Sequence, residues 1–177
     1  MRVLVVVDMQ VDFVNGSLGT QEAIGIVPKV KARIAQAKAD GEMVIFTRDT
    51  HYGDYLKTQE GRNLSVEHCI KNTEGWQIVP ELREYVEEEE VIDKPTFGSI
   101  YLGELLCKMN TEEKIEKVTF IGLCTDICVV SNVLITKASI PEVPVAVEAE
   151  CCAGVTPQSH ENALATMKMC QVQVIGG

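Results

Sequence analysis

The chain has 177 residues, of which 46% are hydrophobic and 24% are charged, the balance of an ordinary globular protein with a sizeable core. The formal net charge of −10 argues against a nucleic-acid partner, because nothing in this composition would neutralise phosphates. No apolar run approaches the roughly 18 residues of a membrane span, so no membrane segment is expected. Seven cysteines, an odd number in a sequence without a signal-peptide pattern, predict reduced thiols and a cytoplasmic location.

Strands and helices are predicted to alternate along the chain. Apolar runs predict buried strands over Val3–Val7, Met43–Thr47, Val118–Ile121 and Val143–Val147, and more weakly over Glu90–Ile92 and Val172–Ile175. Helical spacing predicts helices over Val27–Asp40, Pro80–Val86, Ser99–Lys108, Asp126–Ala138 and Pro157–Met169. This alternation favours an α/β fold, a single-domain three-layer α/β/α sandwich over residues 1–177 with a mostly parallel sheet.

Residues with useful chemistry follow the predicted strands. Ligands of an open parallel sheet bind beyond the carboxyl ends of its strands, so these residues are the candidates for a site. They are Asp8 after the first strand, Asp49 and His51 after the second, Lys94 after the third, and Cys124 and Cys128 after the fourth. The irregular segment 48–78 is long for a compact domain, which is typical of functional loops.

Cys128 is the candidate nucleophile. A helix that begins near Asp126 would place Cys128 in its first turn, where free N–H groups and the helix dipole favour a thiolate. Beside Asp8 and Lys94, such a thiolate could attack an amide while the acid moves protons. At this level Cys128 could also be a buried structural cysteine, Asp8 a capping or lysine-paired carboxylate, and Lys94 a solvent-exposed lysine.

A second group of residues suits a metal ion. Asp49 and His51 are two residues apart at a strand end, so their side chains point the same way in extended backbone. His68 follows later with Glu60 in between, and two imidazoles with carboxylates suit Zn²⁺, Fe²⁺ or Mn²⁺. The alternative is a pair of loop histidines on a wet surface. His160, at a predicted helix start, is expected on the surface.

The remaining cysteines and two aromatic residues have simpler interpretations. Five cysteines lack convergent partners and are expected to fill the core: Cys69, Cys107, Cys151, Cys152 and Cys170. Cys124 and Cys128 are spaced C-x-x-x-C, which fits neither a redox motif nor a zinc pair. Phe13 and Trp76 could each stack on a substrate ring or fill the core.

Five stretches carry a family resemblance: "VVVDMQVDF", "FTRDTH", "EHCIKNTEGWQIVPEL", "IDKPTFGS" and "FIGLCTDICVV". In this order they resemble the isochorismatase-like cysteine hydrolases, and among these the nicotinamidase branch. The resemblance implies a catalytic set of Asp8, Lys94 and Cys128. It also implies a cis peptide between Leu123 and Cys124, which turns the N–H groups of Cys124 and Cys128 toward an oxyanion.

The same resemblance implies metal ligands and a reaction. It assigns Asp49, His51 and His68 to a divalent metal, zinc before iron or manganese, with Glu60 as a further ligand. Phe13 matches an aromatic of the substrate pocket. The implied reaction converts the small-molecule amide nicotinamide to nicotinate and ammonia through a thioester, in a cytoplasmic homo-oligomer. The alternatives are a carbamoyl or ureido amide hydrolase and a catalytically idle member of the family.

The sequence departs from the family pattern near the expected pocket. Thr50 stands where many members have tryptophan, and Tyr52 where proline is common. Ser65 lies where some members place a ring-stacking tryptophan. Glu148 and Glu150 follow the predicted strand Val143–Val147 at the same edge of the sheet, and the sequence gives them no role.

Overall fold

A computed structural model describes residues 1–87 and 90–176, and within them six strands form one parallel sheet. The strands are β1 (Arg2–Val7), β2 (Met43–Asp49), β3 (Val91–Lys94), β4 (Lys117–Leu123), β5 (Val145–Ala153) and β6 (Gln173–Ile175). Their order across the sheet is β3-β2-β1-β4-β5-β6. The order reverses between β1 and β4, the point at which such sheets bind ligands. The predicted α/β fold with a parallel sheet is confirmed.

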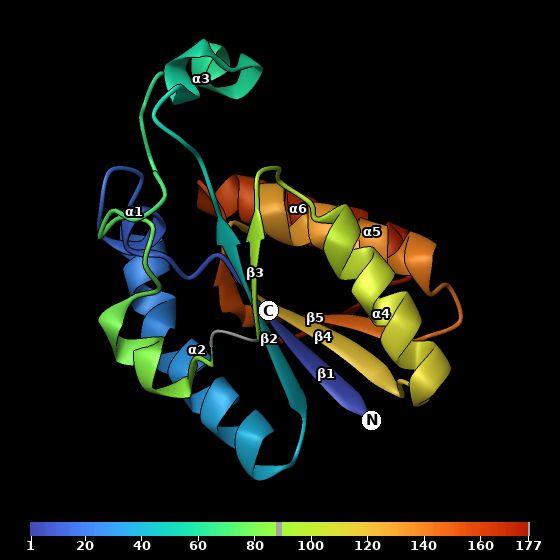
Figure 1. Cartoon of the computed structure of the whole chain (residues 1–177). Coiled ribbons are helices and arrows are strands. Elements are labelled where there is room, and N and C mark those ends of the chain that lie inside the picture. The colour runs from blue at the N-terminus through green and yellow to red at the C-terminus, as the bar shows by residue number, and fades with distance from the viewer. Residues whose placement is uncertain (88–89, 177) are drawn as a thin grey trace.

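Helices cover both faces of this sheet (Figure 1). The α-helices are α1 (Val11–Val14), α2 (Gln21–Ala39), α3 (Gln59–Asn63), α4 (Ile100–Glu112), α5 (Val130–Ser139) and α6 (Pro157–Met169). Two 3-10 helices, η1 (Tyr55–Lys57) and η2 (Pro80–Tyr85), and a π-helical turn, η4 (Thr125–Val129), complete the described elements. In Figure 1, α1 and α2 lie on one side of the sheet, and α4, α5 and α6 lie on the other. None of the helices in the described residues is long and apolar enough to cross a membrane.

The central strand β1 shows why the sheet must be covered twice. Its side chains alternate between two separate cores, because successive residues of a strand point to opposite faces. Val3, Val5 and Val7 pack with residues of α4, α5 and α6. Leu4 and Val6 pack with residues of α2. An unbroken apolar run is therefore the pattern that a fully buried parallel strand requires.

The helix predicted over Val27–Asp40 begins six residues earlier, at Gln21. Thr20 caps it, since its side-chain oxygen accepts a hydrogen bond from the N–H of Ala23. Ala23, Ile26 and Val27 continue its buried face at helical spacing. Pro28, which lacks an N–H, is thus held inside the helix by the cap and by the burial of its neighbours.

Two further elements differ from their predictions. Residues 80–85 form a 3-10 helix rather than an α-helix, consistent with a segment too short for stable α-helical turns. Strand β5 runs on through Glu148 and Glu150 instead of ending at residue 147. Glu148 pairs with Arg33 at 2.8 Å and Glu150 with Lys29 at 3.4 Å, both on α2. These glutamates therefore link the sheet to a helix and do not line the site.

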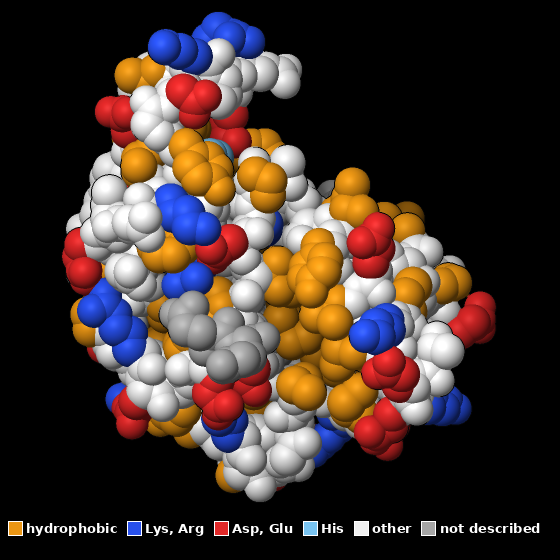
Figure 2. Space-filling model, in the orientation of Figure 1, with side chains coloured by type: hydrophobic (Ala, Val, Ile, Leu, Met, Phe, Trp, Pro, Cys, Tyr) orange, Lys and Arg blue, Asp and Glu red, His pale blue; other side chains and the backbone are white. Residues whose placement is uncertain are grey.

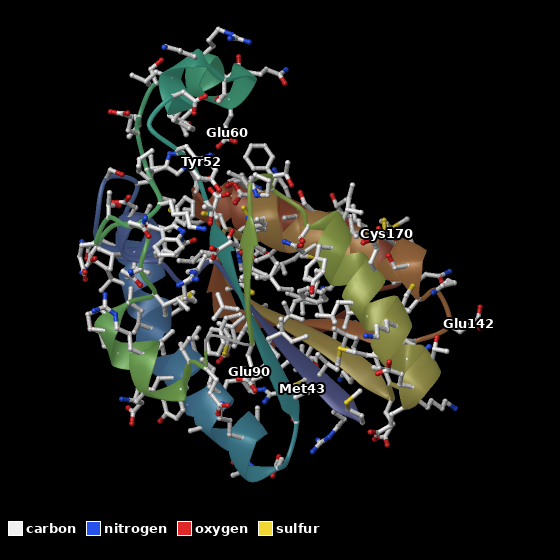
Figure 3. The ribbon with its side chains drawn as sticks, viewed as in Figure 1. Met43, Tyr52, Glu60, Glu90, Glu142 and Cys170 are labelled. Carbon is white, nitrogen blue, oxygen red and sulfur yellow. The ribbon has the colours of Figure 1, made fainter. Side chains whose placement is uncertain are left out.

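The segment 48–78 extends beyond the end of β2 and returns to the sheet. It contains η1 and α3, which lie apart from the three layers in Figure 1. Figure 3 shows Glu60 directed from α3 toward the sheet, far from Met43 at the start of β2. The segment thus brings side chains back over the carboxyl edge.

Candidate active site

Asp8, Lys94 and Cys128 meet at the carboxyl edge of the sheet, and we refer to them as the triad. The Nζ atom of Lys94 lies 2.7 Å from Oδ2 of Asp8 and 3.5 Å from Sγ of Cys128. The three residues come from the end of β1, the end of β3 and the turn η4. Their exposed fractions are only 0%, 1% and 4%. The structure therefore brings together, out of water, the three residues that the resemblance implied.

Backbone geometry fixes the position of Asp8. Its φ of 48° is unusual for a residue other than glycine and turns the chain sharply after β1. The Oγ1 of Thr47 donates a hydrogen bond to Oδ1 of Asp8 at 2.6 Å. Next to it, Gly122 has a φ of 115°, and a Cβ there would lie 2.1 Å from the carbonyl oxygen of Val7. Only glycine lets β4 pass this close to the start of the Asp8 turn.

Burial controls the protonation of the triad. It raises the pKa of Asp8, and the charge of Lys94 opposes this only in part. Burial also raises the pKa of the Cys128 thiol well above its ordinary value, although Lys94 lowers it. The pKa of Lys94 is raised, because Asp8, Cys128 and Asp49 outweigh its burial. Burial and the neighbouring carboxylates of Asp8 and Asp49 thus oppose the thiolate that the helix N-terminus was expected to favour.

The turn that carries Cys128 is a π-helical turn ahead of α5. The peptide bond between Leu123 and Cys124 is cis, and the carbonyl oxygen of Cys124 accepts hydrogen bonds from the N–H groups of Ile127 and Val129, both at 3.1 Å. The Nδ2 atom of Asn132 donates to the carbonyl oxygen of Cys128 at 2.8 Å. These hydrogen bonds hold the turn so that the side chain of Cys128 faces Asp8 and Lys94.

Two residues that support this turn were missed from the sequence. Asn132 is fully buried, and its Oδ1 also accepts from the N–H of Ser99, so it ties α5 to the start of α4. His160 lies 2.8 Å from Oγ1 of Thr125, measured from its Nδ1, and is half-buried rather than on the open surface. A polar residue four positions after Cys128 in a helical pattern was the available signal for Asn132. No local pattern links Thr125 to His160, 35 residues away.

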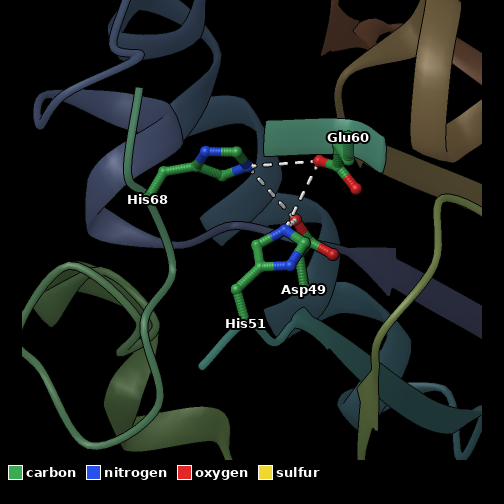
Figure 4. Close-up of side chains that lie close together, drawn as sticks. All are labelled: Asp49, His51, Glu60 and His68. Atoms are coloured by element: carbon green, nitrogen blue, oxygen red, sulfur yellow. Dashed lines mark hydrogen bonds and ion pairs between the residues drawn. The ribbon is translucent and has the colours of Figure 1, made fainter. Parts of the chain in front are cut away.

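Asp49, His51, Glu60 and His68 form a second group, the four-residue cluster (Figure 4). Its candidate ligand atoms all lie within 4.8 Å of one another. The Nε2 of His51 is 3.0 Å from Asp49 Oδ2 and 3.4 Å from Glu60 Oε1. The Nε2 of His68 is 3.6 Å from each of the same two oxygens. The alternative of histidines on a wet surface is wrong, since both histidines are buried.

The four-residue cluster fits a divalent metal ion. A tetrahedral metal with bonds of about 2.0–2.2 Å holds its ligand atoms about 3.3–3.6 Å apart, close to the separations found here. The Nδ1–H of His68 donates to the carbonyl oxygen of Val66 at 2.8 Å, which leaves Nε2 free to coordinate. Oxygen and imidazole donors suit zinc, iron or manganese. The arrangement therefore has the ligand types, the spacing and the supporting hydrogen bond that such a metal needs.

Charge within the cluster is balanced by protons in the free protein. Burial raises the pKa of Asp49, but hydrogen bonds from His51 and His68 and the charge of Lys94 bring it well below its usual range. Burial lowers the pKa of His51, but Asp49 and Glu60 raise it to about 9. Protonated His51 thus supplies the positive charge that a metal ion would supply, and a metal that binds must displace this proton.

Residues near β1 hold the cluster in place. The Oε1 of Gln10 accepts from the N–H of Asp49 at 2.7 Å, and its Nε2 donates to the carbonyl oxygens of Asp49 and Trp76 at 2.9 and 2.8 Å. The Oδ2 of Asp12 accepts from the N–H of Cys69 at 2.8 Å, beside His68. No sequence pattern indicates these roles of Gln10 and Asp12, because their partners are backbone groups of distant segments.

One cavity of about 500 Å³ connects the two groups. Cys128 and Cys124 line one part of it, and Asp49, Glu60 and His68 line another. Phe13 also lines it, with its ring centroid 5.4 Å from that of His68. The groups are joined directly as well, since Lys94 Nζ lies 3.5 Å from Asp49 Oδ1. A small molecule in this cavity would contact both.

Other predicted residues lie elsewhere. Trp76 is buried under Arg48, whose guanidinium lies 3.9 Å from the ring centroid, so its core interpretation is correct. Cys69, Cys151 and Cys152 are buried as expected. Cys107 is half-buried and donates to the carbonyl oxygen of Ser139, whereas Cys170 is exposed at the end of α6, so the packing prediction is wrong for Cys170.

A doubly covered parallel sheet with a buried thiol, acid and amine over a small cavity defines a class of small-molecule hydrolases. The isochorismatase domain family matches residues 2–177, and the chain belongs to this family. It is 26% identical to the nicotinamidase/pyrazinamidase of Mycobacterium tuberculosis over 194 residues, covering 99% of this chain and 98% of that protein.

Solved structures give the same assignment. The pyrazinamidase of Pyrococcus horikoshii, a complex with zinc, superposes with a TM-score of 0.81 at 27% identity, covering 99% of each chain. The N-carbamoylsarcosine amidase of Thermoplasma acidophilum superposes with a TM-score of 0.76 at 25% identity, covering 98% of this chain and 95% of the other. The protein is therefore a hydrolase of the isochorismatase family, and its relatives include enzymes named as amidases.

Proposed function

We propose that the protein is a cytoplasmic metal-containing nicotinamidase, which hydrolyses nicotinamide to nicotinate and ammonia. The observation that carries this proposal is the single cavity shared by the triad and the four-residue cluster. An amide bound there can place its carbonyl carbon at Cys128 while a ring nitrogen faces Asp49 and His68. The nicotinamidase and pyrazinamidase relatives support this choice of substrate.

The first half of the reaction forms a thioester. Asp8 takes the proton of the Cys128 thiol, and Sγ attacks the carboxamide carbon. The N–H groups of Cys124 and Cys128 stabilise the oxyanion of the tetrahedral intermediate. Asp8 then returns the proton to the amide nitrogen, the C–N bond breaks and ammonia leaves. Lys94 keeps Asp8 oriented and compensates charge as the proton moves.

The second half consumes a water molecule. Asp8 takes a proton from this water, and the resulting hydroxide attacks the thioester carbon. The C–S bond breaks, nicotinate is released and Cys128 regains its proton. Because the resting thiol is neutral and faces Asp8, the same carboxylate can act in both halves.

The four-residue cluster would hold a divalent metal, with zinc as the first choice and iron or manganese as alternatives. When bound, this metal supplies a Lewis-acid site for the ring nitrogen. Phe13 would contact the ring beside His68. The chain's own side chains thus fix the distance between the ring nitrogen and the reactive carboxamide.

Ammonia release from nicotinamide by the metal-replete protein tests this function. Wild type should release ammonia, and Cys128→Ala should not, although its circular dichroism spectrum stays unchanged. Ammonia release by Cys128→Ala at the wild-type rate would contradict the mechanism. Inactivity of both proteins on nicotinamide would contradict the proposed substrate.

A carbamoyl or ureido substrate is the second candidate, favoured by the similarity to the N-carbamoylsarcosine amidase. The triad would cleave its C–N bond in the same way, without a need for a ring nitrogen near Asp49. A panel of primary amides and N-carbamoyl compounds, scored by ammonia release, separates the two candidates. If the protein is instead a catalytically idle family member, its Cys128 should react with iodoacetamide no faster than a free thiol.

The predicted homo-oligomer is tested separately, by size-exclusion chromatography with light scattering.

A further inference from the structure

The cavity is larger than a single-ring amide needs. Its volume of about 500 Å³ lies in the range of about 300–1,000 Å³ that is typical of sites for drug-sized ligands. Nicotinamide has one six-membered ring and one carboxamide, so it leaves part of this space unfilled. If the proposed function is right, the substrate that fits the site best carries a further group.

The remaining space is lined mainly by apolar side chains, together with the uncharged polar residues Thr20, Gln59, Asn63 and Thr96. Five apolar side chains from separate segments line it, and we call them the apolar subsite: Leu18, Leu64, Phe97, Ile127 and Val155. Leu64, Phe97 and Val155 are 40%, 46% and 51% exposed, so their side chains offer free apolar surface to a ligand in the cavity. Figure 2 shows orange side chains beside the acidic and histidine side chains below α3. The apolar subsite shares its cavity with Asp49, Glu60 and His68 of the four-residue cluster.

The lining residues also select against charge. None of the cavity-lining residues in the described part of the chain is lysine or arginine, and two of them, Asp49 and Glu60, are acids. Lys94 does not line the cavity and is already paired with Asp8. Away from the four-residue cluster, a carboxylate or phosphate on the substrate would find no lysine or arginine among these lining residues to pair with. An uncharged apolar group is therefore the extension that this surface fits.

The two fixed ends of the ring determine where the extension points. With the carboxamide at Cys128 and the ring nitrogen toward Asp49 and His68, position 5 of a pyridine-3-carboxamide faces away from both. We propose that the preferred substrate is an aromatic primary amide with a short apolar substituent at this position, held by the apolar subsite. Each methylene removed from water tightens binding by roughly fourfold. A butyl group, partly left in solvent, should gain at least about tenfold.

Binding and turnover are measured separately to test this. The Cys128→Ala protein, loaded with zinc, is titrated calorimetrically with nicotinamide, with 5-butylnicotinamide and with 5-(3-carboxypropyl)nicotinamide. The butyl compound should bind at least about tenfold more tightly than nicotinamide, and the carboxypropyl compound no more tightly. In wild type, the ratio of the kcat/KM values for butyl compound and nicotinamide should rise similarly. Equal binding of all three compounds would overturn the inference.

A matched pair of leucines shows whether the gain comes from the apolar subsite. Leu64→Gln should reduce the butyl preference to below about threefold, because it places an amide in the subsite at nearly unchanged size. Leu56→Gln is the control: Leu56 belongs to the same segment and is 48% exposed, but it does not line the cavity. It should keep the full preference, and an equal loss in both variants would overturn the assignment.

The experiment distinguishes this inference from the proposed function. If nicotinamide is hydrolysed but the butyl group adds no affinity, the apolar subsite is wrong and the nicotinamidase reaction stands. If neither amide is hydrolysed by wild type but the butyl compound binds more tightly and Leu64→Gln removes that gain, the subsite stands. The search for the scissile group then moves to other apolar amides.

Discussion

The triad and the four-residue cluster lie in one cavity but are built in different ways. The triad comes from the sheet itself: Asp8 and Lys94 end strands, and Cys128 follows β4 on a tight turn. The cluster takes only Asp49 from the sheet, and its other members come from the segment after β2. Glu60 has 22% of its side chain exposed, against 0% for Asp8 and Lys94. The triad, which would break the bond, is therefore held mainly by the sheet. The four-residue cluster, which would hold the ring, is carried mainly by the segment after β2.

Removing the charge of Lys94 should have the largest effect, because Lys94 belongs to the triad that the sheet holds. Lys94→Met leaves the carboxylate of Asp8 buried without its cation and removes one of the positive charges beside Asp49. Loss of one partner of a buried ion pair costs about 3–5 kcal/mol. We expect a loss of this size in the free energy of unfolding, measured by urea denaturation, and no detectable turnover.

Thr47→Val is the matched control for this change. It removes a buried hydrogen-bond donor to Asp8 but no charge, so it should cost only about 1–2 kcal/mol. If the two variants lose equal stability, the charge of Lys94 does not hold the triad together.

Metal removal should affect the four-residue cluster and the segment that carries it, and leave the sheet intact. After dialysis against a chelator, the four-residue cluster would lose the proposed ion between α3 and β2, whereas the hydrogen bonds of the sheet would persist. Thermal stability should fall by about 2–4 kcal/mol relative to protein saturated with metal. Hydrogen exchange should accelerate over residues 52–68 and stay unchanged in β1 and β4. Equal acceleration in the strands would show that the sheet and this segment are not separable.

The sequence predicted the triad better than the four-residue cluster, for a physical reason. The runs Val3–Val7 and Val118–Ile121 are apolar on both faces, which only a buried parallel strand explains, and strand ends of such a sheet share one edge. The positions of Asp8, Lys94 and Cys128 follow from that rule together with the family motifs.

What the sequence could not show depends on contacts between distant segments. Gln10 binds backbone atoms of Asp49 and Trp76, and no side-chain pattern encodes partners of that kind. The residues around Cys128 indicate the helix start, which favours a thiolate, but neither the burial nor the carboxylates that raise the pKa of this thiol. The apolar stripe alone predicts a start of α2 at Val27, whereas the cap at Thr20 starts the helix at Gln21.

Gln10 connects the two groups, and its replacement should have an intermediate effect. Gln10→Leu removes both hydrogen bonds to the backbone of Asp49 without touching a ligand atom. Loss of a residue that orients a metal ligand typically costs 10–100-fold in metal affinity. We expect a loss in this range by zinc titration, with Gln36→Leu on the exposed face of α2 unchanged. Unchanged affinity in Gln10→Leu would mean that β2 alone positions Asp49.

His160 should give the smallest effect, confined to the turn that carries Cys128. His160→Ala deprives the fully buried Oγ1 of Thr125 of its 2.8 Å partner, which costs about 1–3 kcal/mol of stability. Thr125 lies between the two residues whose N–H groups would hold the oxyanion, so kcat should fall by up to about tenfold while KM is retained. His160→Asn places a polar atom near the position of Nδ1 and should restore most of the rate. If the role of His160 is purely structural, His160→Ala should lower stability without changing kcat at temperatures where the protein is folded. The contact between Thr125 and His160 would then stabilise the fold and not the reaction.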